Sequence, residues 1–192
     1  MWELASLFSL DAAGSGFVVT SLLVLWLHLR FDLDTGTTAA VFFAAGLLAG
    51  LSQLLAGPLA ARIGLIRTMS YTHLPANGAL ALAAFAPWPW LAIGLLLLRA
   101  TFSQMDVPAR QSFVMAVVPS EERAAAASVT NVPRSLASAS TPLLAGALLN
   151  HSTFGWPLII AGTTKAAYDV LLLVLYRHVP EAVAGEPVHS SS

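Results

Sequence analysis

Long apolar stretches separated by short polar connections make up almost the whole chain. A membrane-spanning helix needs about 20 mainly apolar residues, and the stretches that qualify are residues 4–28, 38–61, 68–86, 91–114, 124–149 and 157–176. Residues that break helices, chiefly proline, glycine and charged residues, fall at 32–36, 62–67, 87–90, 118–123 and 151–156. The pattern predicts an all-α integral membrane protein. We expect a six-helix transmembrane bundle over residues 1–177 and a disordered tail over residues 178–192.

The composition agrees with this interpretation and excludes several classes of partner. Of the 192 residues, 57% are hydrophobic and 10% are charged, and the net charge is -1. Such a chain has no basic field for nucleic acid. It contains no cysteine, so disulfides and thiolate metal sites are excluded. We therefore expect the lipid bilayer as a partner, no nucleic acid, no metal or other cofactor, and a multi-pass location in the inner (plasma) membrane of the cell.

The basic residues predict the orientation of the bundle, because Lys and Arg near span ends favour the cytoplasmic side. In a six-span arrangement one side holds Arg62, Arg67, Arg110, Arg123 and Arg177, and the other holds Arg30. Both termini are therefore expected to be cytoplasmic, including the tail.

Small residues predict where helices approach one another closely. In the second span Gly46 and Gly50 form a GxxxG step, and Gly57 follows two turns later. The fifth span carries alanines and serines along much of its length. Tight helix packing is the interpretation that we favour for both spans.

Six charged residues fall inside the predicted spans, where a charge costs at least about 2.5–3.5 kcal/mol at the bilayer centre. They are Asp11, Arg99, Asp106, Arg134, Lys165 and Asp169. Charges of this kind must face protein or water rather than lipid tails. These six residues are therefore the first candidates for function.

Two pairs among the charges have i, i+4 spacing, which places both members on one helix face. Lys165 and Asp169 can neutralise one another, and we expect them to form a structural ion pair. Asp106 and Arg110 are separated by Pro108, which removes a backbone hydrogen bond and favours a kink. This kink is either a hinge at the inner mouth of the bundle or a purely structural feature.

The other charges are candidates for substrate binding or proton coupling. Asp11 precedes the glycine-containing stretch of residues 12–16, where the helix is easily deformed. Arg99 is an isolated charge, and its natural partner is either Asp11 or a substrate anion. Asp106 and Arg134 complete this set of candidates. His73 titrates near neutral pH in its unperturbed form, but we favour a hydrogen-bonded packing role for it.

The motifs of several enzyme classes are missing from the sequence. It has no HExxH zinc motif, no nucleophile elbow around its single Gly-Ser-Gly, and no GxxxxGK phosphate loop. We therefore expect that the protein is not an enzyme.

Two stretches carry a resemblance to a known family. "AGPLAARIGLIR" at 56–67 resembles the cytoplasmic Gly-x-Leu-Ala-Asp-Arg-x-Gly-Arg motif of the major facilitator superfamily, through Gly57, Leu59, Ala60, Arg62 and Gly64, and Arg67 lies at its end. "DVPARQSFVMAVVPSEER" at 106–123 resembles the loop between the tenth and eleventh helices, through Pro119, Glu122 and Arg123. The chain thus resembles the C-terminal six-helix half of drug-resistance-like members.

The resemblance implies secondary active transport of a small molecule, with protons as the expected coupling ion. It also implies a three-plus-three inverted repeat, a midplane site and an N-terminal six-helix half as partner. Asp11 and Arg99 then lie on cavity-lining helices. Three arrangements remain open: half of a longer transporter, a half-size protein that works as a homodimer or heterodimer, and a membrane module that binds a partner without transporting.

Overall fold

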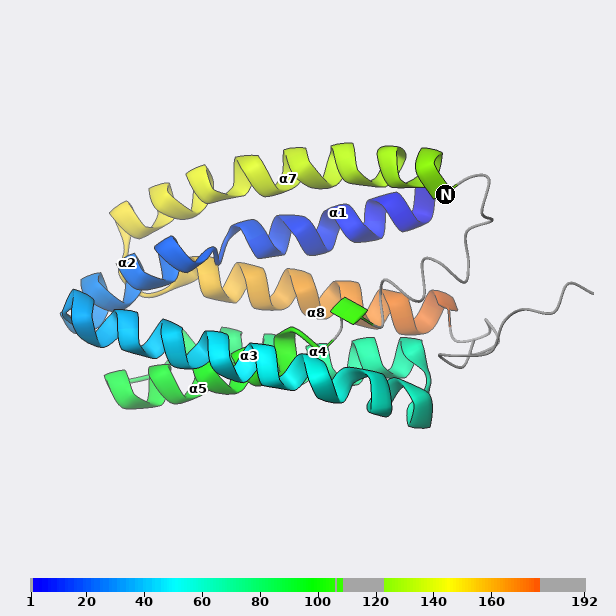
Figure 1. Cartoon of the computed structure of the whole chain (residues 1–192). Coiled ribbons are helices and arrows are strands. Elements are labelled where there is room, and N and C mark those ends of the chain that lie inside the picture. Colours follow the sequence, from blue (N-terminus) through cyan, green and yellow to red (C-terminus); the bar gives the residue numbers. More distant parts are fainter. Residues whose placement is uncertain (1, 106, 109–122, 177–192) are drawn as a thin grey trace, which may run out of the picture.

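The computed structural model describes residues 2–105, 107–108 and 123–176. In these residues it is all-helical, and the labelled helices lie lengthwise in one elongated bundle (Figure 1). The helices are α1 (Trp2–Gly16), α2 (Thr20–Phe31), α3 (Thr35–Ile63), α4 (Leu65–Ala83), α5 (Pro89–Ser103), α7 (Arg123–His151) and α8 (Trp156–Tyr176). Five of the six predicted spans match one helix each, with shifted ends, and the first matches α1 and α2 together. The predicted tail lies outside the described residues.

The first span is broken in the middle. α1 ends at Gly16 and α2 begins at Thr20, so the helix is interrupted within the predicted span 4–28, although Ser9–Phe31 is long and apolar enough to cross a membrane. The break follows the glycine-containing stretch that the sequence identified as easily deformed. Val18, inside the break, is buried, so this bend is held by packing against the rest of the bundle.

The fourth predicted span is interrupted after Ser103. α5 ends there, the backbone turns at Gln104 and Met105, and residues 107–108 are helical again. Residues 106 and 109–114 of this predicted span lie outside the described residues. Pro108 explains the end point. Pro108 has no N–H to donate to the carbonyl of Gln104, four residues earlier. In a continuous helix its ring would also clash with that carbonyl.

The contacts between helices follow an approximate twofold pattern. α1 packs against α7 and α8, and α5 packs against α3 and α4 in the same way. α4 and α8 form the central contact. Exchanging the first three spans for the last three turns the contacts of α1 into those of α5 and leaves the α4–α8 contact unchanged. The exchanged spans α1 and α5 run in opposite directions along the bundle (Figure 1), as an inverted repeat requires.

The polar ends of α3 show how the sequence fixes its length. Asp34 caps the N-terminus, where it accepts hydrogen bonds from the Thr37 hydroxyl (2.5 Å) and backbone N–H (3.0 Å). These bonds hold the pKa of Asp34 below its usual range. At the other end Gly64 has φ of +88°, a conformation that side chains with a Cβ disfavour. One glycine therefore makes the whole turn from α3 into α4.

Glycines in different helices meet very different surroundings. A Cβ added to Gly16 would overlap Thr141 Oγ1 of α7, so α1 and α7 approach closely there. A Cβ added to Gly46, Gly50 or Gly57 of α3 would meet no atom within 4 Å among the described residues. The GxxxG step of α3 therefore makes no close helix contact among the described residues, and tight packing at this step stays a prediction.

Three segments of the described chain are long and apolar enough to cross a membrane: Ser9–Phe31, Thr35–Ile63 and Trp156–Leu175. α5 is a shorter apolar helix. α4 is less apolar because it carries polar residues such as Thr68, His73 and Asn77, and these are buried against other helices. Large apolar side chains such as Phe43 and Leu54 of α3 cover the outside. The chain is therefore built as a membrane protein.

Candidate functional site

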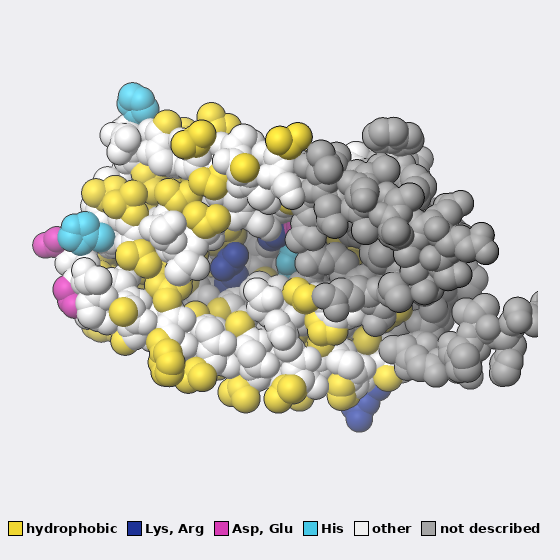
Figure 2. All heavy atoms as spheres, turned by 45° about the horizontal axis from the view of Figure 1, so that its top comes forward, with side chains coloured by type: hydrophobic (Ala, Val, Ile, Leu, Met, Phe, Trp, Pro, Cys, Tyr) yellow, Lys and Arg dark blue, Asp and Glu magenta, His cyan; other side chains and the backbone are white. Residues whose placement is uncertain are grey.

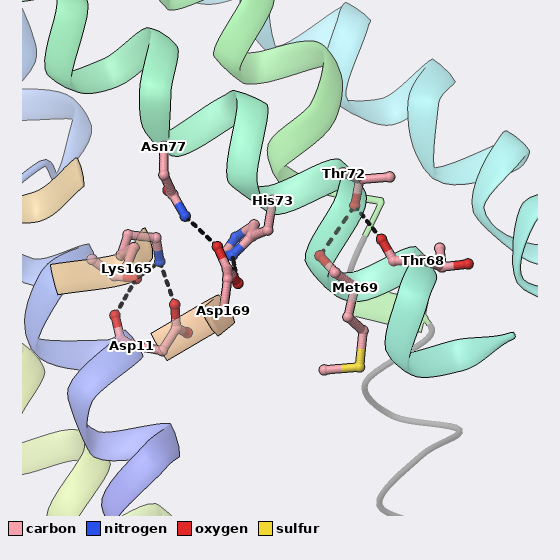
Figure 3. Close-up of polar contacts among 9 residues, drawn as sticks. Asp11, Thr68, Met69, Thr72, His73, Asn77, Lys165 and Asp169 are labelled. Carbon is pink, nitrogen blue, oxygen red and sulfur yellow. Dashed lines mark hydrogen bonds and ion pairs between the residues drawn. The ribbon is translucent and has the colours of Figure 1, made fainter. Parts of the chain in front are cut away.

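A layer of buried polar side chains separates two apolar clusters inside the bundle. One cluster includes Trp26, Leu80 and Leu158, and the other includes Leu7, Met69 and Leu172. Between them along α1, α4 and α8 lie the polar residues Asp11, His73, Asn77, Lys165 and Asp169, all of them buried. Figure 3 shows these side chains converging from the three helices.

Asp11 of α1 and Lys165 of α8 form a buried ion pair. Lys165 Nζ lies 2.5 Å from Asp11 Oδ1, and the two residues are 5% and 3% exposed. The same ammonium donates to Ser15 Oγ at 2.8 Å, and this hydroxyl donates to the backbone carbonyl of Asp11 at 3.0 Å. Gly14 leaves room for the lysine, because a Cβ there would lie 2.6 Å from Lys165 Cγ. Three residues of one α1 segment thus build the lysine site.

Asp169 of α8 is held by α4. Its Oδ2 accepts a hydrogen bond from Asn77 Nδ2 at 2.8 Å, and its Oδ1 lies 3.1 Å from His73 Nδ1. His73 and Asn77 are four residues apart and therefore share one face of α4. The hydrogen-bonded packing role that was expected for His73 is confirmed. Asp169 is 1% exposed, so these α4 groups replace water around the carboxylate.

The pairing within α8 therefore differs from the one expected from its spacing. Lys165 binds Asp11 and Asp169 binds His73 and Asn77, so each member of the proposed structural pair has a partner on another helix. The physical reason is that i, i+4 spacing only brings two side chains near one another. Neighbouring helices here offer close contacts to both.

Each charge of this layer is compensated by groups on another helix, Asp11 and Lys165 by one another and Asp169 by polar side chains of α4. A low-dielectric interior favours charges that are paired and hydrogen-bonded in this way.

Arg99 of α5 lies in a different environment. It is half-buried and lines a cavity of about 290 Å³ between α2, α3 and α5. No hydrogen bond or ion pair joins its guanidinium to any other residue in the described part of the chain. Asp11, one of its two expected partners, is paired with Lys165 instead. Figure 2 shows a hollow in the middle of one face, with basic side chains inside it beside histidine and acidic atoms, and with apolar side chains around it.

The cavity lies near the middle of the predicted membrane. Arg99 is ten residues from the start of α5, and Thr20, which also lines the cavity, is eleven residues from the end of α2. At 1.5 Å per residue both lie roughly 15 Å from the same end of the bundle, about half of a 30 Å hydrocarbon core. The break between α1 and α2 opens on this cavity through Val18, Val19 and Thr20.

The remaining candidates are placed less fully. Asp106 lies outside the described residues, and Arg134 lies within α7 although its side chain is not described. Of the motif-like segment, Gly57, Leu59 and Arg62 lie in α3, Gly64 forms the turn, and Arg67 is in the first turn of α4. That segment is therefore mostly helical rather than a loop, and Arg62 and Arg67 are exposed.

Several site residues were missed by reading the sequence alone. Ser15 completes the lysine site, and Thr20, Ser103 and Gln104 line the cavity around Arg99. A polar residue within one or two turns of an intramembrane charge was the available signal. It was too weak to use, because Ser and Thr in apolar helices also bond to their own backbone, as Thr101 does with the carbonyl of Leu97.

Comparison with known proteins adds an independent finding. The family model of the Major Facilitator Superfamily matches residues 4–191. An uncharacterized membrane protein of Saccharomyces cerevisiae is 22% identical over 178 residues, which cover 92% of this chain and 40% of the yeast protein. The chain thus spans less than half the length of that relative.

Proposed function

Because the chain belongs to the Major Facilitator Superfamily, we propose that it forms the C-terminal six-helix half of a secondary active transporter. In this proposal the transporter moves a small molecule across the plasma membrane by alternating access, and both ends of the chain are cytoplasmic. An N-terminal six-helix half completes the substrate path, as part of the same polypeptide or as a separate subunit. The twofold pattern of helix contacts supports this arrangement.

The observation that carries the proposal is the position of Arg99. Intramembrane charges are costly, and those without a structural partner mark substrate or ion pathways. Arg99 lines a cavity, and no described residue neutralises it. A purely structural arginine would have a carboxylate or several carbonyls around its guanidinium.

Coupling to protons is assigned to the buried polar layer, with Asp11 as its central group. Protonation of Asp11 would remove the charge that neutralises Lys165 and so weaken the contact between α1 and α8. α1 also leads into the broken segment beside the cavity. A protonation event on this helix can therefore change the shape of the substrate site, which is what coupling requires.

The two-half arrangement is tested by the size of the native product. An antibody against residues 178–192 detects the protein in its own membranes. A band near twice the calculated 20.1 kDa supports two halves in one polypeptide. A band near 20.1 kDa, with no second subunit recovered by crosslinking, would contradict pairing with an N-terminal half and would favour a homodimer.

Transport is tested with everted membrane vesicles that contain the native-length protein. Respiration acidifies the vesicle interior, and a fluorescent pH indicator reports proton exit when a compound from a panel of organic acids, amines and neutral molecules is added. We expect at least one compound to cause proton exit. No response from any compound, together with no exchange of labelled compound, would contradict the proposal.

Variants assign the roles within this assay. Asp11→Asn should lose substrate-driven proton movement by tenfold or more, whereas Asp11→Glu, which keeps the charge, should retain part of it. Asp32→Asn removes an exposed charge at the C-terminal end of α2, outside the cavity, and is the matched control. Normal proton movement in Asp11→Asn would show that Asp11 is not the coupling group.

A further inference from the structure

The chemistry around Arg99 points to the class of molecule that the site accepts. We propose that the cavity between α2, α3 and α5 binds a small organic anion with an apolar body, and that Arg99 binds its negatively charged group. This inference rests on the proposed transport function and specifies its substrate class.

The charge of the cavity is the first argument. Its lining contains Arg99 and no carboxylate among the described residues. The buried acids of the described bundle are already engaged, Asp11 by Lys165 and Asp169 by His73 and Asn77. The positive charge of Arg99 therefore remains to be neutralised, and a substrate cation would be repelled by it.

The other lining groups agree with an anion that also has an apolar part. Thr20, Ser103 and Gln104 provide hydroxyl and amide donors on the same cavity as Arg99. Val18, Phe42 and Leu96 provide an apolar surface. A guanidinium can bind a carboxylate through two parallel N–H···O bonds, whereas the apolar wall binds the rest of the molecule.

The start of α2 adds to the field of Arg99. α2 has no side-chain cap at its N-terminus, and that end lines the cavity at Val19 and Thr20. The N-terminus of a helix carries a partial positive charge. It lies at about the same depth as Arg99, so both sources of positive potential act on the same volume.

The experiment compares ligands of one shape and different charge. Purified native-length protein in detergent is heated with benzoate, benzamide or benzylammonium, and with hexanoate, hexanamide or hexylammonium. Thermal unfolding curves over a range of concentrations give the dissociation constants. We expect at least one carboxylate to bind tenfold or more tightly than its amide, and the ammonium compound to bind no better than the amide.

Variants connect the preference to Arg99. Arg99→Gln should lose the tenfold preference for the carboxylate, and Arg99→Lys should recover part of it because the charge is retained. Asp32→Asn, outside the cavity, should behave as wild type. Circular dichroism and a single peak in size-exclusion chromatography establish that each variant is folded, so that a loss of binding is not a loss of structure.

The results that would overturn the proposal are distinct. Equal binding of a carboxylate and its amide, undiminished binding by Arg99→Gln, or no binding by either carboxylate would each refute an anion site. Transport of amines or neutral compounds in the vesicle assay, without transport of acids, would refute the substrate class and leave the transport function standing. Absence of transport for every compound would instead refute the transport function itself.

Discussion

The buried polar layer and the Arg99 cavity both contain charged side chains inside the same bundle. The charges of the layer have protein partners, whereas Arg99 has none in the described chain. In the layer, Lys165 lies 2.5 Å from Asp11, and Asp169 is held by two α4 side chains. In the cavity, Arg99 has open volume beside it and no protein partner in the described chain. Burial of a charge in a membrane helix therefore does not by itself identify a binding site. The absence of a partner beside a cavity is the more informative feature.

The two regions also differ in how closely their helices approach one another. Around the polar layer, glycines of α1 allow close approach, and a Cβ on Gly14 or Gly16 would overlap α8 or α7. Around the cavity, Gly46 of α3 has open space. One region is therefore a closed contact between helices, and the other is a surface that remains available to a ligand or to another protein segment.

The strongest test of this comparison removes Lys165. In Lys165→Met the carboxylate of Asp11 remains buried without its cation, so we expect the free energy of unfolding to fall by about 3–5 kcal/mol. Unfolding by SDS titration in mixed micelles measures it. The double variant Asp11→Asn/Lys165→Met should recover most of the loss. A double variant as unstable as the single one would argue against direct pairing.

The second test removes one donor to Asp169. Asn77→Leu leaves Oδ2 without its amide, and hydrogen bonds to charged groups contribute about 1.5–3 kcal/mol. We expect a loss of that size in the same unfolding measurement. Thr101→Val in α5 is the control from the open region, because its hydroxyl bonds to the carbonyl of Leu97 four residues earlier in the same helix. Equal losses in both variants would remove the distinction between the regions.

The third test exchanges glycines. Gly16→Ala introduces a Cβ that overlaps Thr141 Oγ1, and overpacking of this kind costs about 1–3 kcal/mol. Thr141→Ala in the same chain should restore part of the stability. Gly46→Ala has room for the added methyl and should be neutral or stabilising by up to about 1 kcal/mol, as helix propensity predicts. If Gly46→Ala lowered the free energy of unfolding as much as Gly16→Ala, this face of α3 would be packed against another segment in the assembled protein.

The smallest effect on stability is expected for Arg99. Arg99→Gln breaks no hydrogen bond or ion pair in the described chain, so its free energy of unfolding should stay within about 0.5 kcal/mol of wild type, as for substitutions away from specific interactions. Arg62→Gln, on the exposed end of α3, provides the reference. A loss near that of Lys165→Met would mean that a protein carboxylate neutralises Arg99, and the two regions would then be of one kind.

The fold was largely predictable because apolar length determines which segments span a membrane. The second, third, fifth and sixth predicted spans agree with α3, α4, α7 and α8 to within about three residues at each end. The differences fall in the first and fourth predicted spans, which line the cavity together with the second. The first is broken after Gly16, and the fourth is interrupted after Ser103. In both cases the signals, the glycines near 14–16 and Pro108, were recognised, but their effect on helix continuity was underestimated.

The sequence identified the residues of the candidate site better than it identified the contacts between them. The sequence identified six costly charges, and the side chains of four of them, Asp11, Arg99, Lys165 and Asp169, have defined places in the structure. It paired Lys165 with Asp169, and it left Arg99 a choice between Asp11 and a ligand. The structure pairs Asp11 with Lys165. Pairing could not be derived from spacing, because partners on one helix compete with partners on neighbouring helices whose positions the sequence does not state.

The amino-acid sequence was sufficient to establish that this is a multi-span membrane chain and that its intramembrane charges must turn away from lipid. Both follow from the transfer free energy of side chains, which is a property of composition and local length. The packed arrangement of the helices was needed to learn which charges neutralise one another and which one, within the described chain, has a cavity in place of a partner. That outcome depends on how closely and at which rotation the helices approach. Here single contacts such as Gly14 against Lys165 and Gly16 against Thr141 fix α1 relative to its neighbours.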